Sequence, residues 1–241
     1  MDEFDVFVAC GGDGTIQCIA NELINSDKIM GILPVGSGND FVKIFGIHLS
    51  KKDYIDILVN GIIKKYDLVQ VNNESKFINT FGIGFDAMAN EIASRIKVSV
   101  GRFKYFFAAL WSLISVSRLE FSLKVDENSP KHYSSYLVVI TNGRWEGGTF
   151  FISPDSVPTD GLLEMTISTS TNKFSLLKTL LRLILLKDLD ENEIEKISFK
   201  SAEIALKKPV ISHSDGEVLN PSNKYSFRVH PKAVNILSPI N

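Results

Sequence analysis

The chain has 241 residues, enough for one large domain or two modest ones, and 44% of them are hydrophobic, as in an ordinary globular protein. Its formal net charge of −2 provides no overall basic field, so the composition argues against nucleic acid as the partner. Two cysteines are too few for a disulfide framework, which favours a reducing, cytoplasmic compartment, and no apolar run reaches transmembrane length.

The first part of the chain alternates predicted strands with loops and helices. Residues 4–9 are apolar almost throughout and predict a buried strand, and a second strand is predicted over 29–35. The spacing of apolar residues predicts a helix over 16–25 with Thr15 as its cap. Shorter helices are predicted over 41–45 and 53–60. This order of elements predicts an α/β unit.

A glycine-rich loop that contains one aspartate follows each of the two strands. The first loop is made of Gly11, Gly12, Asp13, Gly14 and Thr15, and the second of Gly36, Ser37, Gly38, Asn39 and Asp40. Open α/β sheets bind ligands at the carboxyl ends of their strands, and glycines let backbone N–H groups approach phosphate oxygens. A carboxylate beside them can hold the cation that neutralises a polyphosphate. The two loops therefore predict a nucleotide-phosphate site and phosphoryl transfer.

The character of the sequence changes between residues 61 and 67, where we place a domain boundary. Strands are predicted over 65–71, 76–83, 120–125, 135–141, 163–168, 196–199, 203–206, 210–212, 225–229 and 234–237. Two very apolar helices are predicted over 103–116 and 174–186. They are either core helices that cover a sheet or, with their flanking lysines and arginines, surfaces that meet lipid.

Asp67 lies near the expected domain junction. If Asp13, Asp40 and Asp67 converge on one cleft, they could hold a hydrated Mg²⁺, which needs few protein ligands. The alternative is that the three aspartates are unrelated turn formers or caps. The loop context favours the metal role for Asp13, whereas the turn role is the stronger one for Asp67 taken alone.

Three further acidic residues lie next to glycines in the second part of the chain. Asp215 and Glu217 flank Gly216 between two predicted strands, where Asp-Gly is an ordinary hairpin turn. The functional alternative is that Glu217 removes a proton from an acceptor hydroxyl while Asp215 orients it or helps bind metal. Asp160, before Gly161, is either a turn residue or part of a site for a structural cation.

Several motifs together resemble the diacylglycerol kinase catalytic domain family, shared with sphingosine kinases and bacterial lipid kinases. They run in family order along almost the whole chain: the two glycine loops, residues 79–87, Asn142-Gly143 with Gly147-Gly148, Pro154, Asp160-Gly161 and Asp215-Gly216-Glu217. The resemblance implies an α/β ATP-binding domain at residues 1–66 and a β-sandwich-rich lipid-substrate domain at 67–230. Residues 231–241 are expected to return to the first domain.

The resemblance also implies a reaction and roles for residues. The family transfers the γ-phosphate of ATP to a lipid hydroxyl with Mg²⁺, here most simply from ATP to diacylglycerol, which gives phosphatidic acid. Asp13, Asp40 and Asp67 would belong to the Mg-ATP site, and Asp160 to a structural Mg²⁺ site. Glu217 would be the general base, with Asp215 as its partner. The expected partners are a lipid substrate and a membrane surface bound peripherally, and a homodimer is one option for assembly.

The chain also departs from the family pattern. Lys43 stands where arginine is usual, and Thr159 replaces a common acidic residue. The family's first strand and its Asn-Pro-x-Ser-Gly loop are not found, so we expect about 50 residues to precede this segment in an intact enzyme. Two alternatives therefore stay open: an enzyme similar to NAD kinases, which share Gly-Gly-Asp-Gly-Thr, and a non-catalytic relative that binds lipid or nucleotide.

Overall fold

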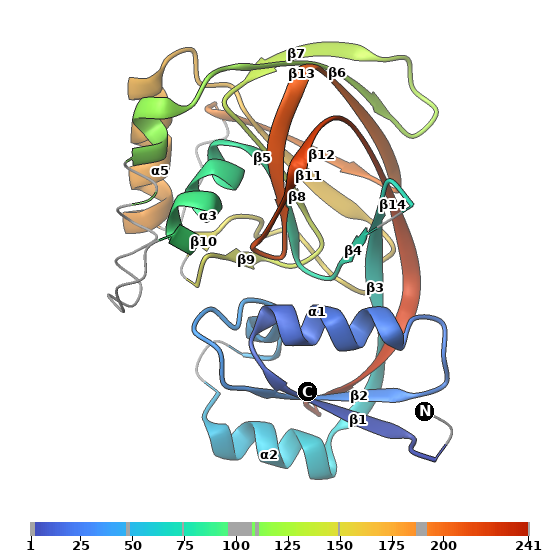
Figure 1. The fold of residues 1–241 in the computed structure, drawn as a ribbon. Coiled ribbons are helices and arrows are strands. Elements are labelled where there is room, and N and C mark those ends of the chain that lie inside the picture. Colours follow the sequence, from blue (N-terminus) through green and yellow to red (C-terminus); the bar gives the residue numbers. More distant parts are fainter. Residues whose placement is uncertain are drawn as a thin grey trace.

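The computed structural model describes residues 3–46, 49–73, 75–95, 108, 111–148, 150–186 and 192–240. A small α/β unit lies below a larger β-rich unit, and two strands run from one unit into the other (Figure 1). These strands are β3 (Ile62–Val71) and β14 (Glu217–Ser238).

The α/β unit is built on two parallel strands, β1 (Val6–Gly11) and β2 (Ile29–Pro34). The end of β14 continues this sheet in parallel beside β2, and β3 lies antiparallel on the other side of β14. Helix α1 (Asp13–Glu22) lies on the face toward the β-rich unit, and α2 (Lys51–Asn60) on the opposite face (Figure 1). Apolar side chains from all these elements form one core, which includes Ile16, Met30, Ile57, Tyr66 and Ile236.

The caps of the two helices differ. Ser50 and Asp53 form a complete capping box at the start of α2. Gly12 is the N-cap of α1, and no side chain bonds there, so the prediction that Thr15 caps this helix is wrong. Thr15 instead lies inside the first turn and folds over Gly11, where any Cβ would overlap its side chain.

The β-rich unit continues the same twelve-stranded sheet. β14 pairs with β13 (Ser201–Ser214), followed in order by β5 (Thr80–Gly84), β8 (Leu137–Thr141), β11 (Leu163–Ser168) and β12 (Ile194–Phe199). β6 (Leu119–Val125) also pairs with β13 and carries β7 (Lys131–Ser135), and β4 (Ser75–Phe77) pairs with β3. Short strands β9 (Trp145–Glu146) and β10 (Phe150–Phe151) form a separate pair. The main core lies inside this folded sheet and includes Phe81, Ile140, Met165, Phe199 and Phe227.

Two helices cover one side of the β-rich unit, α3 (Phe85–Arg95) and α5 (Lys173–Leu186) (Figure 1). They pack on a third apolar cluster, which includes Phe85, Leu137, Val139, Leu176 and Leu183. The sequence did not predict α3. Most of the helix predicted over 103–116 lies outside the described residues, although residues 111–115 are helical. Among the residues described, no helix is long and apolar enough to cross a membrane.

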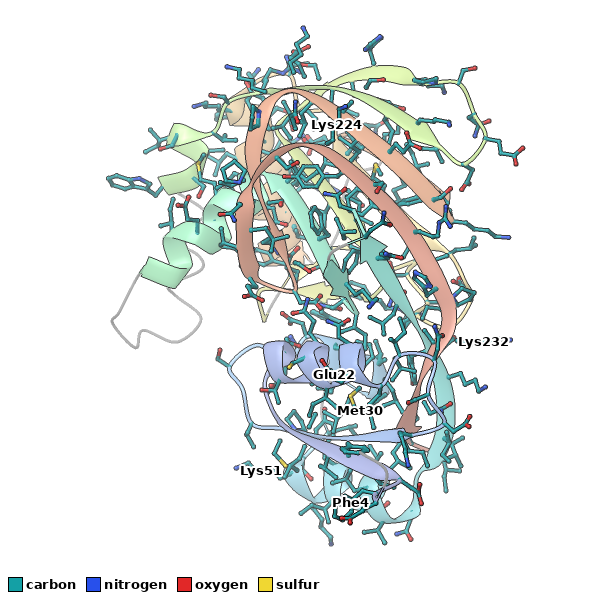
Figure 2. All side chains as sticks on the ribbon, turned by 45° about the vertical axis from the view of Figure 1, so that its right-hand side comes forward. Phe4, Glu22, Met30, Lys51, Lys224 and Lys232 are labelled. Atoms are coloured by element: carbon teal, nitrogen blue, oxygen red, sulfur yellow. The ribbon has the colours of Figure 1, made fainter. Side chains whose placement is uncertain are left out.

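The two units meet where β3 and β14 cross from one to the other, at the level of Lys232 in Figure 2. The register of β14 against β3 shifts between His230 and Val234, and Lys232 has a positive φ of 55°. This irregularity lets one long strand belong to the parts of the sheet in both units. The boundary placed between residues 61 and 67 stays a prediction.

Candidate active site

The two glycine loops lie in direct backbone contact at the carboxyl ends of β1 and β2. A Cβ on Gly36 would overlap the Cα of Gly12, so this approach requires glycine. Asn39, with a positive φ of 49°, closes the second loop: its side chain accepts the Gly36 N–H at 3.0 Å and donates to the Gly36 carbonyl at 2.9 Å. The loops therefore form one preorganised surface.

Helix α1 begins in this surface. The N–H groups of Thr15 and Ile16 bond the Gly12 carbonyl, whereas those of Asp13 and Gly14 precede the first helical hydrogen bonds. A Cβ at Gly14 would meet nothing within 4 Å. Open N–H groups at the positive end of a helix favour a bound anion such as phosphate.

Asp13 and Asp40 lie together against Gly38. A Cβ there would be 3.1 Å from an Asp13 oxygen and 3.3 Å from an Asp40 oxygen. The Phe41 N–H donates to Asp13 at 3.1 Å. Burial and the neighbouring Asp40 charge raise the pKa of Asp13. Two carboxylates this close favour a cation beside them, so the pair fits the chemistry of a Mg²⁺ ligand set.

Asp40 also ties this surface to the β-rich unit. Both of its oxygens accept the N–H of Gly148, at 3.1 and 3.0 Å. Lys43 pairs with Asp40, donates to the Gly148 carbonyl at 2.9 Å and lies over the Trp145 ring at 5.5 Å. The lysine that replaces the family's usual arginine is thus part of the contact between the two units.

Asp215 lies in the hairpin turn between β13 and β14. Asp215 and Gly216 have φ values of 49° and 85°, as in the two-residue turns that favour Asp-Gly. The Asp215 carboxylate accepts three backbone N–H groups, from Ile78 at 3.0 Å, Asn79 at 3.0 Å and Thr80 at 2.9 Å. Burial, with a smaller contribution from Asp13, raises its pKa to about 7, although the three N–H groups act in the opposite direction.

The structure brings this turn to the start of α1. Gln17, one helical turn after Asp13, donates to the Ser214 hydroxyl at 3.1 Å and to the Lys76 carbonyl at 2.9 Å. The charge of Asp13 acts on Asp215 across the same contact. Glu217 is exposed, directly after the turn. Asp13, Asp40 and Asp215 therefore gather where the two units face one another, and Glu217 follows Asp215 by two residues.

Asp67 has Asp160 and Lys232 as its charged neighbours, and its place in one site with Asp13 and Asp40 stays a prediction. Asp67 is fully buried, and its oxygens accept the N–H groups of Gly161 and Lys232, each at 2.7 Å. Burial raises the pKa of Asp67, and the nearby Asp160 charge adds to the rise. Because β3 and β14 cross between the units here, Asp67 braces both crossing strands.

A buried cluster of Asp86, Glu146 and His213 was missed by sequence reasoning. His213 Nε2 lies 2.7 Å from Asp86 and 2.9 Å from Glu146. Within the described part of the chain, these are the three ligand-type side chains that lie within 4.8 Å of one another. The sequence contained one indication of this cluster, because His213 stands two residues before the candidate site residue Asp215.

An apolar pocket opens beside this cluster. Its walls come from α3, β8, β9, the segment 147–152 and α5: Phe85, Asp86, Ala89, Asn90, Leu137, Val139, Glu146, Gly147, Phe150, Ile152, Leu180 and Leu183. Asp86 and Glu146 are its two charged residues. A mainly apolar wall with two acidic groups at one place suits a molecule that joins a hydrocarbon part to a hydroxyl-bearing part.

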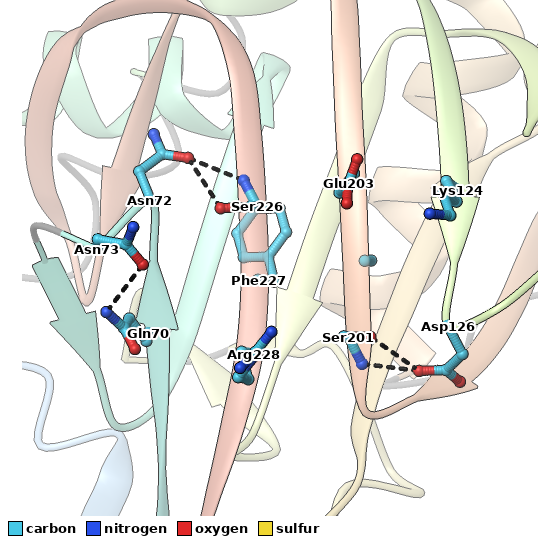
Figure 3. A pocket seen from close by; sticks show the side chains of 11 residues that line it. Gln70, Asn72, Asn73, Lys124, Asp126, Ser201, Glu203, Ser226, Phe227 and Arg228 are labelled. Carbon is cyan, nitrogen blue, oxygen red and sulfur yellow. Dashed lines mark hydrogen bonds between the residues drawn. The ribbon is translucent and has the colours of Figure 1, made fainter.

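A polar hollow of about 200 Å³ lies elsewhere, among β3, β14, β13 and β6 (Figure 3). Polar side chains of this hollow are engaged by neighbouring backbone groups. Asn72 accepts the Ser226 N–H at 2.8 Å, and Asp126 accepts the Ser201 N–H at 2.8 Å. It includes no residue of the glycine loops or of the Asp215 turn. We therefore do not count it in the candidate active site.

Comparison with known proteins gives matches to two family models in succession. The diacylglycerol kinase catalytic domain matches residues 1–71, and the YegS C-terminal NAD kinase beta sandwich-like domain matches residues 79–238. A diacylglycerol kinase of Mycobacterium tuberculosis is 28% identical over 98% of this chain and 77% of its own length. A YegS-like probable lipid kinase of Yersinia pestis is 30% identical over 97% of this chain and 79% of its own length.

Solved structures show the same fold. A crystal structure of a diacylglycerol kinase from Bacillus anthracis gives a TM-score of 0.74 at 20% identity, over 98% of this chain and 77% of that one. An NAD kinase of Archaeoglobus fulgidus gives 0.54 at 11% identity, over 98% and 79%, which is a likeness of fold alone. These likenesses confirm the predicted fold class, an α/β nucleotide-binding domain with a β-sandwich-rich domain. The chain belongs to the diacylglycerol kinase and YegS-like family of lipid kinases.

Proposed function

We propose that this lipid kinase transfers the γ-phosphate of ATP to the free hydroxyl of diacylglycerol and so produces phosphatidic acid. The observation that carries the proposal is the meeting of Asp13, at the glycine loops, with the turn that holds Asp215 and Glu217. Phosphoryl transfer needs a phosphate cradle and an acceptor-activating group that face one another. Here the phosphate cradle would come from the α/β unit and the acceptor-activating group from the β-rich unit.

The nucleotide end of the site fits ATP with Mg²⁺. The open N–H groups at the start of α1 would bind phosphate oxygens, and the close backbone contact of Gly12 and Gly36 keeps side chains out of their way. Asp13 would hold Mg²⁺, with Asp40 beside it. Bound there, Mg²⁺ would neutralise negative charge on the phosphates.

At the acceptor end, the two acidic groups of the turn have different parts. Asp215 is engaged by three N–H groups, so it fixes the turn rather than moving a proton. Glu217 is exposed beside it and would take the proton of the lipid hydroxyl as the oxygen attacks the γ-phosphorus. The bond between that phosphorus and the bridging oxygen breaks, and ADP leaves with the electron pair. The apolar pocket along α3 and α5 would receive the hydrocarbon part.

The reaction class is tested with γ-labelled ATP, Mg²⁺ and a panel of acceptors in mixed micelles. The panel contains diacylglycerol, phosphatidylglycerol, sphingosine, ceramide and NAD. We expect label in phosphatidic acid, and none with Asp13→Asn. Label in another lipid would support the lipid kinase reaction but reject diacylglycerol as the substrate. Label in NAD alone would reject the lipid kinase reaction for this chain.

Peripheral binding to a membrane is part of this proposal, because the substrate resides in a bilayer. Three large apolar side chains are strongly exposed on α5 and the segment 111–115: Trp111 at 66%, Ile114 at 74% and Phe174 at 79%. Lys173 donates to the Ile114 carbonyl, which holds the two segments together. Leu180 and Leu183 of α5 line the apolar pocket, so the exposed face adjoins the proposed substrate site.

Vesicle sedimentation tests this docking. Binding should rise with anionic lipid and fall with salt, because each lysine or arginine near such a surface contributes about 1 kcal/mol. Replacing both Trp111 and Phe174 by alanine should weaken binding, whereas Val59→Ala, at a residue 75% exposed on α2, should not. Equal binding by the two variants would reject this face.

A further inference from the structure

His213 links the buried acidic cluster to the turn that carries Asp215 and Glu217. It lies at the end of β13, paired with Gly82 on β5 and with Val218 on β14. Its side chain is fully buried. The Gly216 N–H, in the middle of the turn, donates to Nδ1 of the ring at 3.2 Å. A histidine two residues from Asp215 thus holds the turn by a hydrogen bond of its own.

The two ring nitrogens have opposite surroundings. Nδ1 receives an N–H and must offer a lone pair, so the ring proton belongs on Nε2. Nε2 faces the carboxylates of Asp86 on α3 and Glu146 on β9, at 2.7 and 2.9 Å. A Cβ at Gly82 would overlap both Asp86 and the ring, so glycine at this position makes the contact feasible. Thr80 adds a hydrogen bond to Glu146 at 3.3 Å.

Besides the ring proton on Nε2, the close carboxylates of the cluster favour a further proton. Burial raises the pKa of Glu146 to about 7, with Asp86 adding to the rise. Burial lowers the pKa of His213, whereas the charges of the two carboxylates raise it. Once the carboxyl pair carries a proton, most of the charge that raises the pKa of the ring is gone. A second ring proton on Nδ1 would point at the Gly216 N–H, with two donors facing one another. The geometry therefore locates the extra proton on the carboxyl pair while the turn is in place.

A divalent metal does not fit this arrangement. Three such side chains at short range are a common metal-ligand set. A neutral histidine that binds metal through Nε2 carries its proton on Nδ1 and donates it to an acceptor. Here Nδ1 faces a donor, the Gly216 N–H. The cluster is therefore organised around a shared proton.

We propose that His213 is a positioning residue for phosphoryl transfer, which holds the turn of Asp215 and Glu217 in place through Gly216 as a neutral ring with its proton on Nε2. Asp86 and Glu146 fix that tautomer because a carboxylate that accepts a hydrogen bond from one ring nitrogen keeps the proton on that nitrogen. The role rests on the proposed kinase function. A general base must be held within hydrogen-bond reach of the acceptor, so a small displacement of this turn lowers the rate.

Two substitutions at one position separate the two contacts of the ring. In His213→Asn, the amide oxygen lies as many bonds from the backbone as Nδ1 and can accept the Gly216 N–H. In His213→Gln, the amide reaches the position of Nε2 and leaves Gly216 without its acceptor. We expect His213→Gln to lower kcat on diacylglycerol roughly 10- to 100-fold with little change in KM for Mg-ATP. His213→Asn should retain most of the wild-type kcat.

Imidazole ¹⁵N chemical shifts of the wild-type protein provide a readout that needs neither activity nor a variant. At pH 7 we expect the neutral tautomer protonated on Nε2. A charged ring, or a proton on Nδ1, would overturn the proposal. An active wild type with equal kcat for both variants would overturn it as well. A wild type that phosphorylates no lipid would instead overturn the proposed function. The ¹⁵N shifts would still show whether Nδ1 of His213 accepts the Gly216 N–H.

Discussion

At the scale of single residues, the site depends on the absence of side chains as much as on their presence. Gly36 brings its backbone against Gly12, and Gly82 leaves room for His213 and Asp86 to meet. These are positions where a methyl group would have to displace backbone or the His213–Asp86 hydrogen bond. The carboxylates that matter, Asp13 and Asp215, are in turn held by backbone N–H groups from neighbouring segments.

Alanine at two glycines of the same loops should have opposite effects. Gly36→Ala should lower the free energy of unfolding by about 1–3 kcal/mol, because its Cβ would overlap the Cα of Gly12. Gly14→Ala is the matched control: it lies in α1 with nothing near its Cβ, so stability should rise by up to about 1 kcal/mol. Urea unfolding measures both. Similar losses for the two variants would contradict the loop contact.

The buried cluster predicts a pH dependence of stability. Burial raises the pKa of Glu146 to about 7, from the ordinary 4.5 that it regains on unfolding. Between these values the folded state binds more protons than the unfolded state, so stability falls as pH rises, by up to about 1.4 kcal/mol per pH unit. Glu146→Gln should reduce this slope between pH 5 and 7. It should not abolish it, because Asp215 acts with the same sign. An unchanged slope would contradict the assignment.

At the scale of elements, the molecule is organised by two strands that belong to both units. β14 pairs with β13 above and with β2 below, and β3 follows it antiparallel. Asp67 sits where these strands cross and accepts one N–H from Lys232 on β14 and one from Gly161. A carboxylate with two oxygens suits two donors, and this brace explains the residue without a metal.

Asp67→Asn should therefore destabilise the fold. One of the two N–H donors would face an amide NH₂ and stay unsatisfied, so we expect a loss of about 1–3 kcal/mol in urea unfolding. Asp160→Asn is the control. Asp160 is exposed and accepts a single N–H, from Leu162, which an amide oxygen can replace. The brace would be the wrong explanation if Asp160→Asn lowered the free energy of unfolding as much as Asp67→Asn does. It would also be wrong if the two variants differed in stability only when Mg²⁺ was present.

At the scale of the whole molecule, the sequence predicted the parts that local chemistry determines. Glycines and aspartates behind apolar strands located the surface where the two glycine loops meet, because strand ends and loop composition are local properties. The pairing of Asp67 with Asp160, and the approach of His213 to Asp86 and Glu146, depend on contacts between residues far apart in the chain. The helix α3 was missed since its residues 85–95 follow β5 directly, with Gly84, of positive φ, as the one break between strand and helix.

Phosphate binding is proposed for one unit and proton removal for the other, so a single comparison of variants can separate the two roles. Transfer of the γ-phosphate to diacylglycerol and binding of Mg-ATP are measured for the wild type, Asp13→Asn and Glu217→Gln in parallel. Asp13→Asn should lose both Mg-ATP binding and turnover, because it removes the charge beside the phosphates. Glu217→Gln should bind Mg-ATP as the wild type does and turn over about 10²–10⁴-fold more slowly. Near-normal turnover by Glu217→Gln, or equal loss of Mg-ATP binding in both variants, would contradict the division of roles between the two units.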